Sequence, residues 1–254
     1  METLHTMERE KKRSPLFLSC VVIGLLCLVF YGISTTKEED SDDIAPAVED
    51  QYVKKRNSNP NPIVWFSIRI GKTLLTERVV FELFVDVVPL TVENFRCLCV
   101  GHTRRSDGRR LSYKGSLFHK VVPGSFVKGG DITHKNGTGG YSIYGSTFPN
   151  ENFVLSHTRK YLLSMVNLNG PDTTASQFLI TTARAPYLDG RHVVIGKVIA
   201  GHDVVDAIEI EGMKKEKLAL KVTIVDSGEI TNEKEKRKLL EADVQSKKNG
   251  LRKY

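Results

Sequence analysis

Two lysines interrupt the mostly apolar stretch SLFHKVVPGSFVKGGD, residues 116–131. An apolar strand, a Pro-Gly turn and a Gly-Gly-Asp end are typical of the wall of a binding site. Charge brings such a segment no benefit unless it serves a ligand, and Lys120 and Lys128 can each donate a charge-assisted hydrogen bond to a carbonyl or an amide nitrogen. Ordinary solvated lysines are the alternative interpretation.

The glycine-rich stretch GGDITHKNGTGG, residues 129–140, overlaps the end of this segment. It contains no Gly-Lys-Ser/Thr element and opens no helix after a strand, so nucleotide binding is not expected. Asn136-Gly-Thr is an acceptor sequence for N-glycosylation if this part of the chain is lumenal. We expect His134, His157 and His202 to be surface residues.

Cysteine spacing argues against a metal site. Cys97 and Cys99 lie two apart in an expected helix, so they face different sides and do not bridge easily. No Cys-X-X-Cys pair and no Cys/His ligand spacing occurs, so we expect neither a structural zinc site nor a cofactor.

The elements that would hold these residues begin after an apolar N-terminal run. Residues 14–36 contain no charge and are long enough to cross a hydrocarbon core of about 30 Å as a helix. Basic residues precede the run and the acidic segment KEEDSDD follows it, which places residues 1–13 in the cytoplasm and the rest on the lumenal or extracellular side. We therefore predict a single-pass signal anchor. A cleaved signal peptide and a secreted protein are the alternative.

The two ends of the chain differ from its middle in composition. Residues 37–61, acidic and then rich in Pro and Asn, cannot bury a core, so we expect a flexible spacer. Residues 231–254 are charge-rich with few apolar positions and predict a charged tail or a frayed helix. The net charge of +7 is modest, and a nucleic-acid partner for the basic tail does not fit a lumenal domain.

Residues 62–230 carry the pattern of one folded domain. The runs at 63–70 and 78–85, divided at Gly71, predict a hairpin. Further strands are expected within 116–122, 161–167, 176–182, 193–199 and 220–228. Helices are expected from Pro89 to Gly101 and over 202–212, with Val92, Phe95, Leu98 and Cys99 inward in the first and Val204, Val205 and Ile208 inward in the second. Many short strands and only two helices indicate an all-β sandwich or barrel.

The motifs of this domain occur in the order found in cyclophilins. FELF, VPLTVENFRCLC, YKGSLFHKVVPG, VKGGDITHKNGTGGYSIYG, FPNENF, LLSMVN, SQFLITT, YLDGRHVVIGKV and IVDSGEI resemble that family over essentially all of residues 63–230. The resemblance implies an eight-stranded antiparallel barrel closed by two α-helices. It also implies peptidyl-prolyl cis-trans isomerase activity on proline-containing segments of client proteins, in support of protein folding.

Isomerisation turns an X-Pro amide over a barrier of about 18–20 kcal/mol. No covalent step is needed. An enzyme must hold the proline ring in an apolar pocket and stabilise the twisted amide with a positioned donor.

The resemblance carries the site onto this sequence residue by residue. Lys120 stands where the family has the arginine that acts as the donor, so it is the expected catalytic residue. The residues that the resemblance implies for substrate binding are His119, Phe126, Lys128, Val166, Asn167, Gln177, Leu179, Tyr187, Leu188 and His192.

Several of these positions depart from the family pattern. Ser125 and Leu179 replace phenylalanines, Phe126 a methionine and Lys128 a glutamine. Tyr187 stands in place of a tryptophan, a position at which many members have a histidine or a tyrosine. Lysine lacks the rigid fork of arginine, and losing one well-placed donor typically costs about 10²–10³-fold in rate. We therefore expect a slow isomerase that binds cyclosporin weakly. A proline-binding chaperone or escort with little turnover is the alternative. The pairing of Lys120 with Lys128 favours substrates with an acidic residue near the proline.

Overall fold

The structure is a computed structural model of the chain, and it describes residues 61–213 and 220–248. The expected cytoplasmic N-terminus, the membrane anchor at 14–36 and all but the last residue of the spacer lie outside the described residues. Within these two ranges no helix is both long and apolar enough to cross a membrane. Asn61 already belongs to the folded body, because its side chain donates a hydrogen bond to Glu82 Oε1 (2.9 Å).

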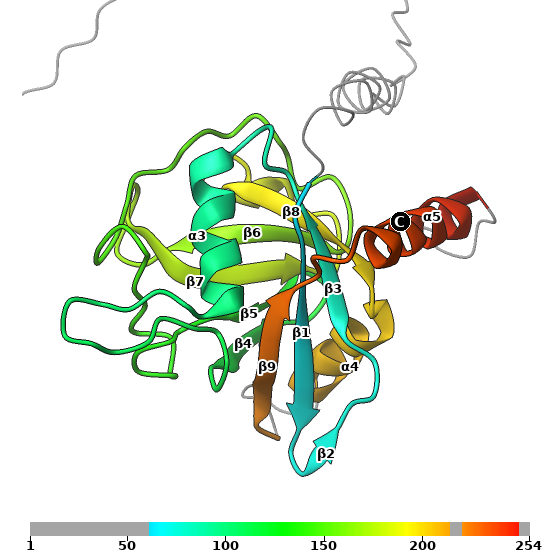
Figure 1. Cartoon of the computed structure of the whole chain (residues 1–254), viewed down its shortest axis with the longest axis horizontal. Helices are drawn as coiled ribbons and strands as arrows, with labels where there is room; N and C mark the ends of the chain where they lie inside the picture. Colours follow the sequence, from blue (N-terminus) through cyan, green and yellow to red (C-terminus); the bar gives the residue numbers. More distant parts are fainter. Residues whose placement is uncertain (1–60, 214–219, 249–254) are drawn as a thin grey trace, which may run out of the picture. The chain divides into compact units, whose positions relative to one another are not determined.

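In the described part of the chain, nine antiparallel strands form one closed sheet (Figure 1). They are β1 (Ile63–Ile70), β2 (Thr73–Leu74), β3 (Val79–Leu83), β4 (Leu117–Val122), β5 (Phe126–Gly129), β6 (Leu162–Asn167), β7 (Thr174–Thr181), β8 (Val194–Ala200) and β9 (Val222–Glu229). Their order is β2-β1-β3-β8-β6-β7-β5-β4-β9, and β9 pairs again with β1. Strand β2 only extends the β1 hairpin, so the other eight form the barrel, as the resemblance implied.

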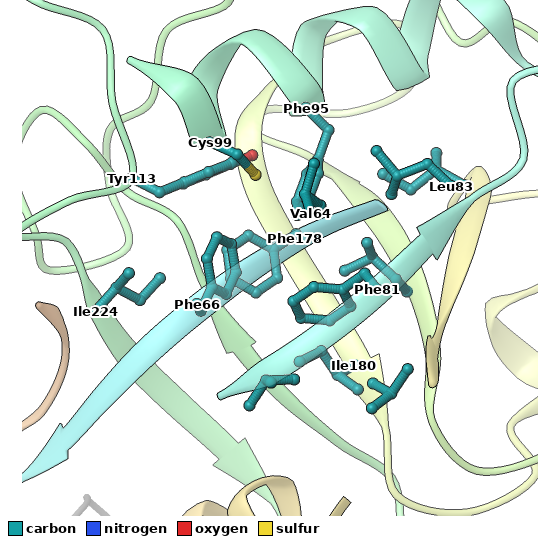
Figure 2. Close-up of a cluster of buried hydrophobic side chains, with 14 of the residues drawn as sticks. Val64, Phe66, Phe81, Leu83, Phe95, Cys99, Tyr113, Phe178, Ile180 and Ile224 are labelled. Carbon is teal, nitrogen blue, oxygen red and sulfur yellow. The ribbon is translucent and has the colours of Figure 1, made fainter. Parts of the chain in front are cut away.

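Alternation along each strand separates the inside of this barrel from its outer face. On β1, Val64, Phe66 and Ile68 are fully buried, and on β7 Phe178 and Ile180 join the same core. Aromatic rings pack at the centre, with ring centroids 5.1 Å apart for Phe66 and Phe81 (Figure 2). This packing fixes β7 in place, and the residues between its inward side chains point to the outer face.

Two helices complete the core as expected. Helix α3 (Pro89–Val100) starts with proline in its first turn and ends at Gly101, which adopts a left-handed conformation with φ of 72°. Helix α4 (His202–Met213) turns Val204, Val205 and Ile208 toward the core. The inward faces predicted for both helices are confirmed.

A third helix, α5 (Glu233–Lys248), lies beyond the two that were expected. Its first turn is capped by Asn232 Oδ1, which accepts hydrogen bonds from the backbone N–H groups of Lys234 (3.0 Å) and Glu235 (3.1 Å). Leu239 and Leu240 pack against a small apolar cluster of the barrel (Ile63, Val80, Ile199 and Ile230). Composition predicted a charged tail or a frayed helix here, and these residues form a helix docked on the domain.

Asp243 of α5 is buried and takes part in an ionic cluster. The Lys197 ammonium on β8 lies 3.2 Å from Asp243 Oδ2 and 3.1 Å from Glu82 Oε2 on β3. Burial of the cluster means that all three charges depend on one another. The cluster holds α5 to β3 and β8.

Candidate active site

The register of three neighbouring strands brings Lys120, Lys128 and Leu179 into one row. Lys120 on β4 pairs directly with Lys128 on β5, and Lys128 pairs with Leu179 on β7. Since Val127 and Phe178 point into the core, alternation places Lys128 and Leu179 on the outer face. Two lysines and an apolar residue that are distant in sequence thus lie side by side.

A β-bulge at His119 sets this register. The pairing between β4 and β5 shifts between Phe118 and Lys120, so His119 is the extra residue. Its ring packs against the loop backbone at Gly137, where an added Cβ would lie 2.6 Å from His119 Cδ2. Burial lowers the pKa of His119, and the positive charge of Lys128 lowers it further, so the ring is neutral at pH 7.

Glu209 of α4 is hydrogen-bonded to the turn of the β4–β5 hairpin. Its Oε1 accepts hydrogen bonds from the backbone N–H of Gly124 (2.7 Å) and from the Thr182 hydroxyl (2.6 Å). The turn is therefore tied both to the helix and to the end of β7. This role could not be predicted from the sequence, because an acidic residue in an amphipathic helix is ordinarily exposed to solvent.

Next to the lysines lies an apolar cluster on the outer face. Its buried members are Val166, Leu179, Ala185 and Leu188, and Phe126 packs against them. Leu179 is only 1% exposed, whereas Phe126 is partly exposed. The structure thus brings together Phe126, Leu179 and Leu188, three of the residues predicted to contact a proline ring, and Val166, which was predicted to bind the peptide.

Leu188 and Tyr187 belong to the short 3₁₀ helix η2 (Pro186–Leu188). Tyr187 is 56% exposed, and its hydroxyl is hydrogen-bonded to the hydroxyl of Ser125, which is 7% exposed. The contact joins η2 to the β4–β5 turn at the edge of the apolar cluster. Two of the positions that depart from the cyclophilin pattern are therefore direct partners.

Asn167 and Gln177 are held by the chain itself. Asn167 Nδ2 donates to the Arg191 carbonyl (3.0 Å) and its Oδ1 accepts from the Thr174 hydroxyl (3.0 Å). Gln177 is fully buried and its Nε2 donates to the carbonyls of Gly137 (2.9 Å) and Gly139 (2.6 Å). The β6–β7 register shifts between Met165 and Asn167, so the backbone of Val166 is outside the regular ladder.

The loop that contacts His119, residues 131–139, is organised around Asp131. Its two carboxylate oxygens accept hydrogen bonds from the backbone N–H groups of Thr133, His134, Asn136, Gly137 and Gly139. Burial on its own raises the pKa of the Asp131 carboxyl, but these hydrogen bonds outweigh it and hold the pKa well below its usual range. Asn136, the glycosylation candidate, is exposed on this loop.

A family sequence model, described as cyclophilin-type peptidyl-prolyl cis-trans isomerase/CLD, matches residues 66–229. This range includes the whole row of strands that carries the site. The chain belongs to the cyclophilins. By family it is a peptidyl-prolyl cis-trans isomerase, whose substrates are proline-containing peptide segments.

Behind the apolar cluster, this cyclophilin has a buried polar chain that the sequence did not indicate. His157 Nδ1 lies 2.7 Å from Asp189 Oδ1, and its Nε2 lies 2.8 Å from the Ser164 hydroxyl, which sits on β6 opposite Leu179. Aspartate, histidine and serine follow one another as in a hydrolase triad. Ser164 is 0% exposed, however, so its hydroxyl does not reach a substrate and the contacts are structural.

Two histidines expected at the surface are in fact buried. His157 is fully buried within the chain just described, and His202 stacks edge-on against Tyr161 with ring centroids 4.5 Å apart. The neighbours of the His157 ring are Asp189 and Ser164, and that of the His202 ring is Tyr161; none is adjacent to its histidine in sequence, so the burial could not be predicted. His134 is exposed as expected.

His192 also lies close to the site, near His157 and the charge of Lys128. Burial, followed by these two neighbours, lowers the pKa of His192 to about 4. Like His119, it is a neutral ring at pH 7. Among the described residues no group of three or more potential ligands could hold a metal ion.

Proposed function

We propose that this cyclophilin isomerises X-Pro bonds slowly, with Lys120 as the donor to the twisted amide. The observation that carries the proposal is the row of Lys120, Lys128 and Leu179, which sets a cationic donor beside an apolar cluster able to contact a proline ring. Lys120 is exposed and its ammonium can swing toward the cluster.

The rate is limited by how well that donor is oriented. As the amide twists, conjugation is lost, and a hydrogen bond that is stronger to the twisted form than to the planar one lowers the barrier. A lysine on a flexible stem presents a strongly hydrated ammonium, whereas arginine presents a planar fork. An imperfectly oriented donor supplies only part of the differential binding.

The covered cluster also favours slow turnover. Leu179, Val166 and Leu188 are almost fully buried and Phe126 packs against them, and we infer that a bound proline ring displaces Phe126 to reach them. Part of the binding energy is then used to displace a phenylalanine. This same observation favours a second candidate function, in which the domain grips proline segments as an escort with little turnover.

Exchange spectroscopy distinguishes the two functions. The full chain in mild detergent is mixed with an Ala-Pro peptide, and cis-trans exchange of the peptide is measured by NMR for the natural chain and for Lys120→Arg and Lys120→Ala. We expect slow exchange that rises about tenfold or more in Lys120→Arg and is lost in Lys120→Ala. Peptide binding without exchange in any of the three variants would show that the escort function is the right one.

We further propose that residues 14–36 anchor the protein in a membrane of the secretory pathway, with the domain on the lumenal or extracellular side. Support comes from the uncharged run and its flanking charges; cleavage after this run would instead give a secreted protein. Asn136 tests the proposal, because it is exposed and precedes Gly-Thr. In cells, we expect endoglycosidase to reduce the mass of the natural chain and not that of Asn136→Gln. A protein without glycan that is open to cytoplasmic protease would reverse the proposed topology.

A further inference from the structure

The Lys120–Lys128 pair is costly unless a ligand uses it. Residues that pair directly on antiparallel strands have Cα atoms about 4.5–5.5 Å apart, and like charges at such positions destabilise the sheet. Lys128 is half-buried; burial lowers its pKa, and the neighbouring charge of Lys120 lowers it further. A neutral polar residue at either position would avoid this cost.

Among the described residues, no carboxylate balances the charge of the pair. Within the described ranges, the ammonium group of neither lysine makes an ion pair or a hydrogen bond, whereas Arg96, Lys114, Lys160 and Lys197 have acidic partners. The acid that raises the pKa of Lys128 is Asp131, and its oxygens already accept five backbone hydrogen bonds. It stabilises its own loop and is not free to approach the lysines.

The histidines around the pair do not change its net charge near pH 7. Burial lowers the pKa of both His119 and His192, so both rings are neutral and neither repels nor binds an anion as a charged partner. The local field therefore comes from the two ammonium groups. It is positive, and it is partly shielded from water on the Lys128 side.

The spacing of the strands places this field within one residue of the proline. Neighbouring strands lie about 4.8 Å apart, so Lys128 Cα is about 5 Å and Lys120 Cα about 10 Å from Leu179 Cα. Consecutive residues of a bound peptide are about 3.8 Å apart. A side chain next to a proline seated on Leu179 therefore extends over the lysines.

We propose that this site selects proline segments in which an acidic side chain, aspartate, glutamate or phosphoserine, directly adjoins the proline. This selectivity rests on the proposed function, in that the same apolar cluster receives the proline ring. The acidic group takes the place of the missing carboxylate and relieves the repulsion between Lys120 and Lys128. Phosphoserine binds best, because its charge of about −2 matches two ammonium groups.

The test measures binding and turnover separately on the full chain in mild detergent. Four peptides of equal length differ only in the residue next to proline: Ala-Pro, Glu-Pro, Lys-Pro and phosphoserine-Pro, with Pro-Glu as a fifth for the other side. Dissociation constants come from NMR titration and exchange rates from the same samples. Lys128→Gln removes one charge of the pair. Lys114→Gln is the matched control, because Lys114 pairs with Asp226 (2.8 Å) outside the site.

We expect at least one of the Glu peptides to bind about 10-fold more tightly than Ala-Pro, phosphoserine-Pro more tightly still, and Lys-Pro more weakly. The preference shrinks to about threefold or less in Lys128→Gln, stays in Lys114→Gln, and falls as salt rises from about 0.01 M to about 1 M. Equal binding of the Ala, Glu and Lys peptides would overturn the inference even if exchange is catalysed. Charge-selective binding without exchange would support the inference while removing the proposed catalysis, and failure of every peptide to bind would overturn both.

Discussion

The hydroxyl groups of Ser125 and Tyr187 are hydrogen-bonded to each other across the edge of the apolar cluster. Ser125 lies at the tip of the β4–β5 hairpin, and Tyr187 lies in η2. A phenylalanine and a tryptophan occupy these positions in the pattern that the sequence resembles; phenylalanine has no hydrogen-bonding group and tryptophan no hydroxyl, so that pattern lacks this bond. The two replacements are therefore one structural unit, and changing either alone leaves a hydroxyl without its partner.

Cyclosporin binding tests this coupling. We expect the natural chain to bind the drug weakly and Tyr187→Trp to improve the affinity only modestly. The substitution removes the hydroxyl partner of the buried Ser125 hydroxyl, which lowers the stability of the site by about 1–3 kcal/mol. The double variant Ser125→Phe, Tyr187→Trp should bind more tightly than the two single effects predict. Isothermal titration calorimetry measures the affinity of the natural chain, the two single variants and the double variant alike. Additive single effects would show that the two positions act independently.

The cover over Leu179 leads to a second prediction. Phe126 packs against the buried members of the apolar cluster and is the one that remains partly exposed. Phe126→Met keeps an apolar side chain but makes it flexible, so a proline ring displaces it more easily. We expect the dissociation constant for an Ala-Pro peptide to fall about threefold, with Phe153→Met as an exposed control that changes nothing. Weaker binding in Phe126→Met would mean that the phenylalanine ring is itself a wall of the proline pocket.

Docking of α5 leads to a third prediction, on stability. Asp243→Ala removes a buried carboxylate 3.2 Å from the Lys197 ammonium and leaves that charge with less compensation. We expect the free energy of unfolding in urea to fall by about 2–3 kcal/mol. Glu241→Ala, on an exposed position of the same helix, should change it by less than about 0.5 kcal/mol. Equal effects of the two substitutions would mean that α5 contributes through helix propensity and not through this contact.

Much of the barrel could be predicted because local pattern and tertiary burial agree there. The inward residues of α3 and α4 repeat at helical spacing, and buried and more exposed residues alternate along β1. The face of each element that packs in the core could therefore be predicted from the sequence. Strand β5 was not separated as a strand of its own, because it has four residues and one of them is Lys128. Its place depends on pairing with β4 and β7, which a single segment does not encode.

The features that sequence reasoning missed all depend on partners distant in the chain. Helix α5 has few apolar residues, and it is held by Leu239, Leu240 and the charge of Lys197. His157 is buried because Asp189 and Ser164 satisfy both of its nitrogens. Resemblance to a family predicted the site residues, but it gave no information on what replaces a lost contact, such as the Ser125–Tyr187 bond.

The low pKa of His192 makes a fourth prediction, on the pH dependence of stability. In the unfolded chain the ring titrates near its usual value of 6.5, whereas burial, His157 and Lys128 lower the pKa to about 4 in the folded protein. Between these two values the unfolded chain binds a proton that the folded protein does not, so the free energy of unfolding falls as the pH decreases from 6.5 to 4. Below that window the effect levels off.

The substitution His192→Gln isolates this contribution, because the other titrating groups, including His119 and His157, remain in both proteins. We expect the difference in stability between the natural chain and the variant to shift by about 2 kcal/mol in favour of the variant from neutral pH to pH about 4, allowing for solvent screening of a half-buried ring. Urea unfolding at a series of pH values measures it. A difference that stays constant across the window would mean that His192 keeps its ordinary pKa in the folded protein, and that the charge of Lys128 is screened from it.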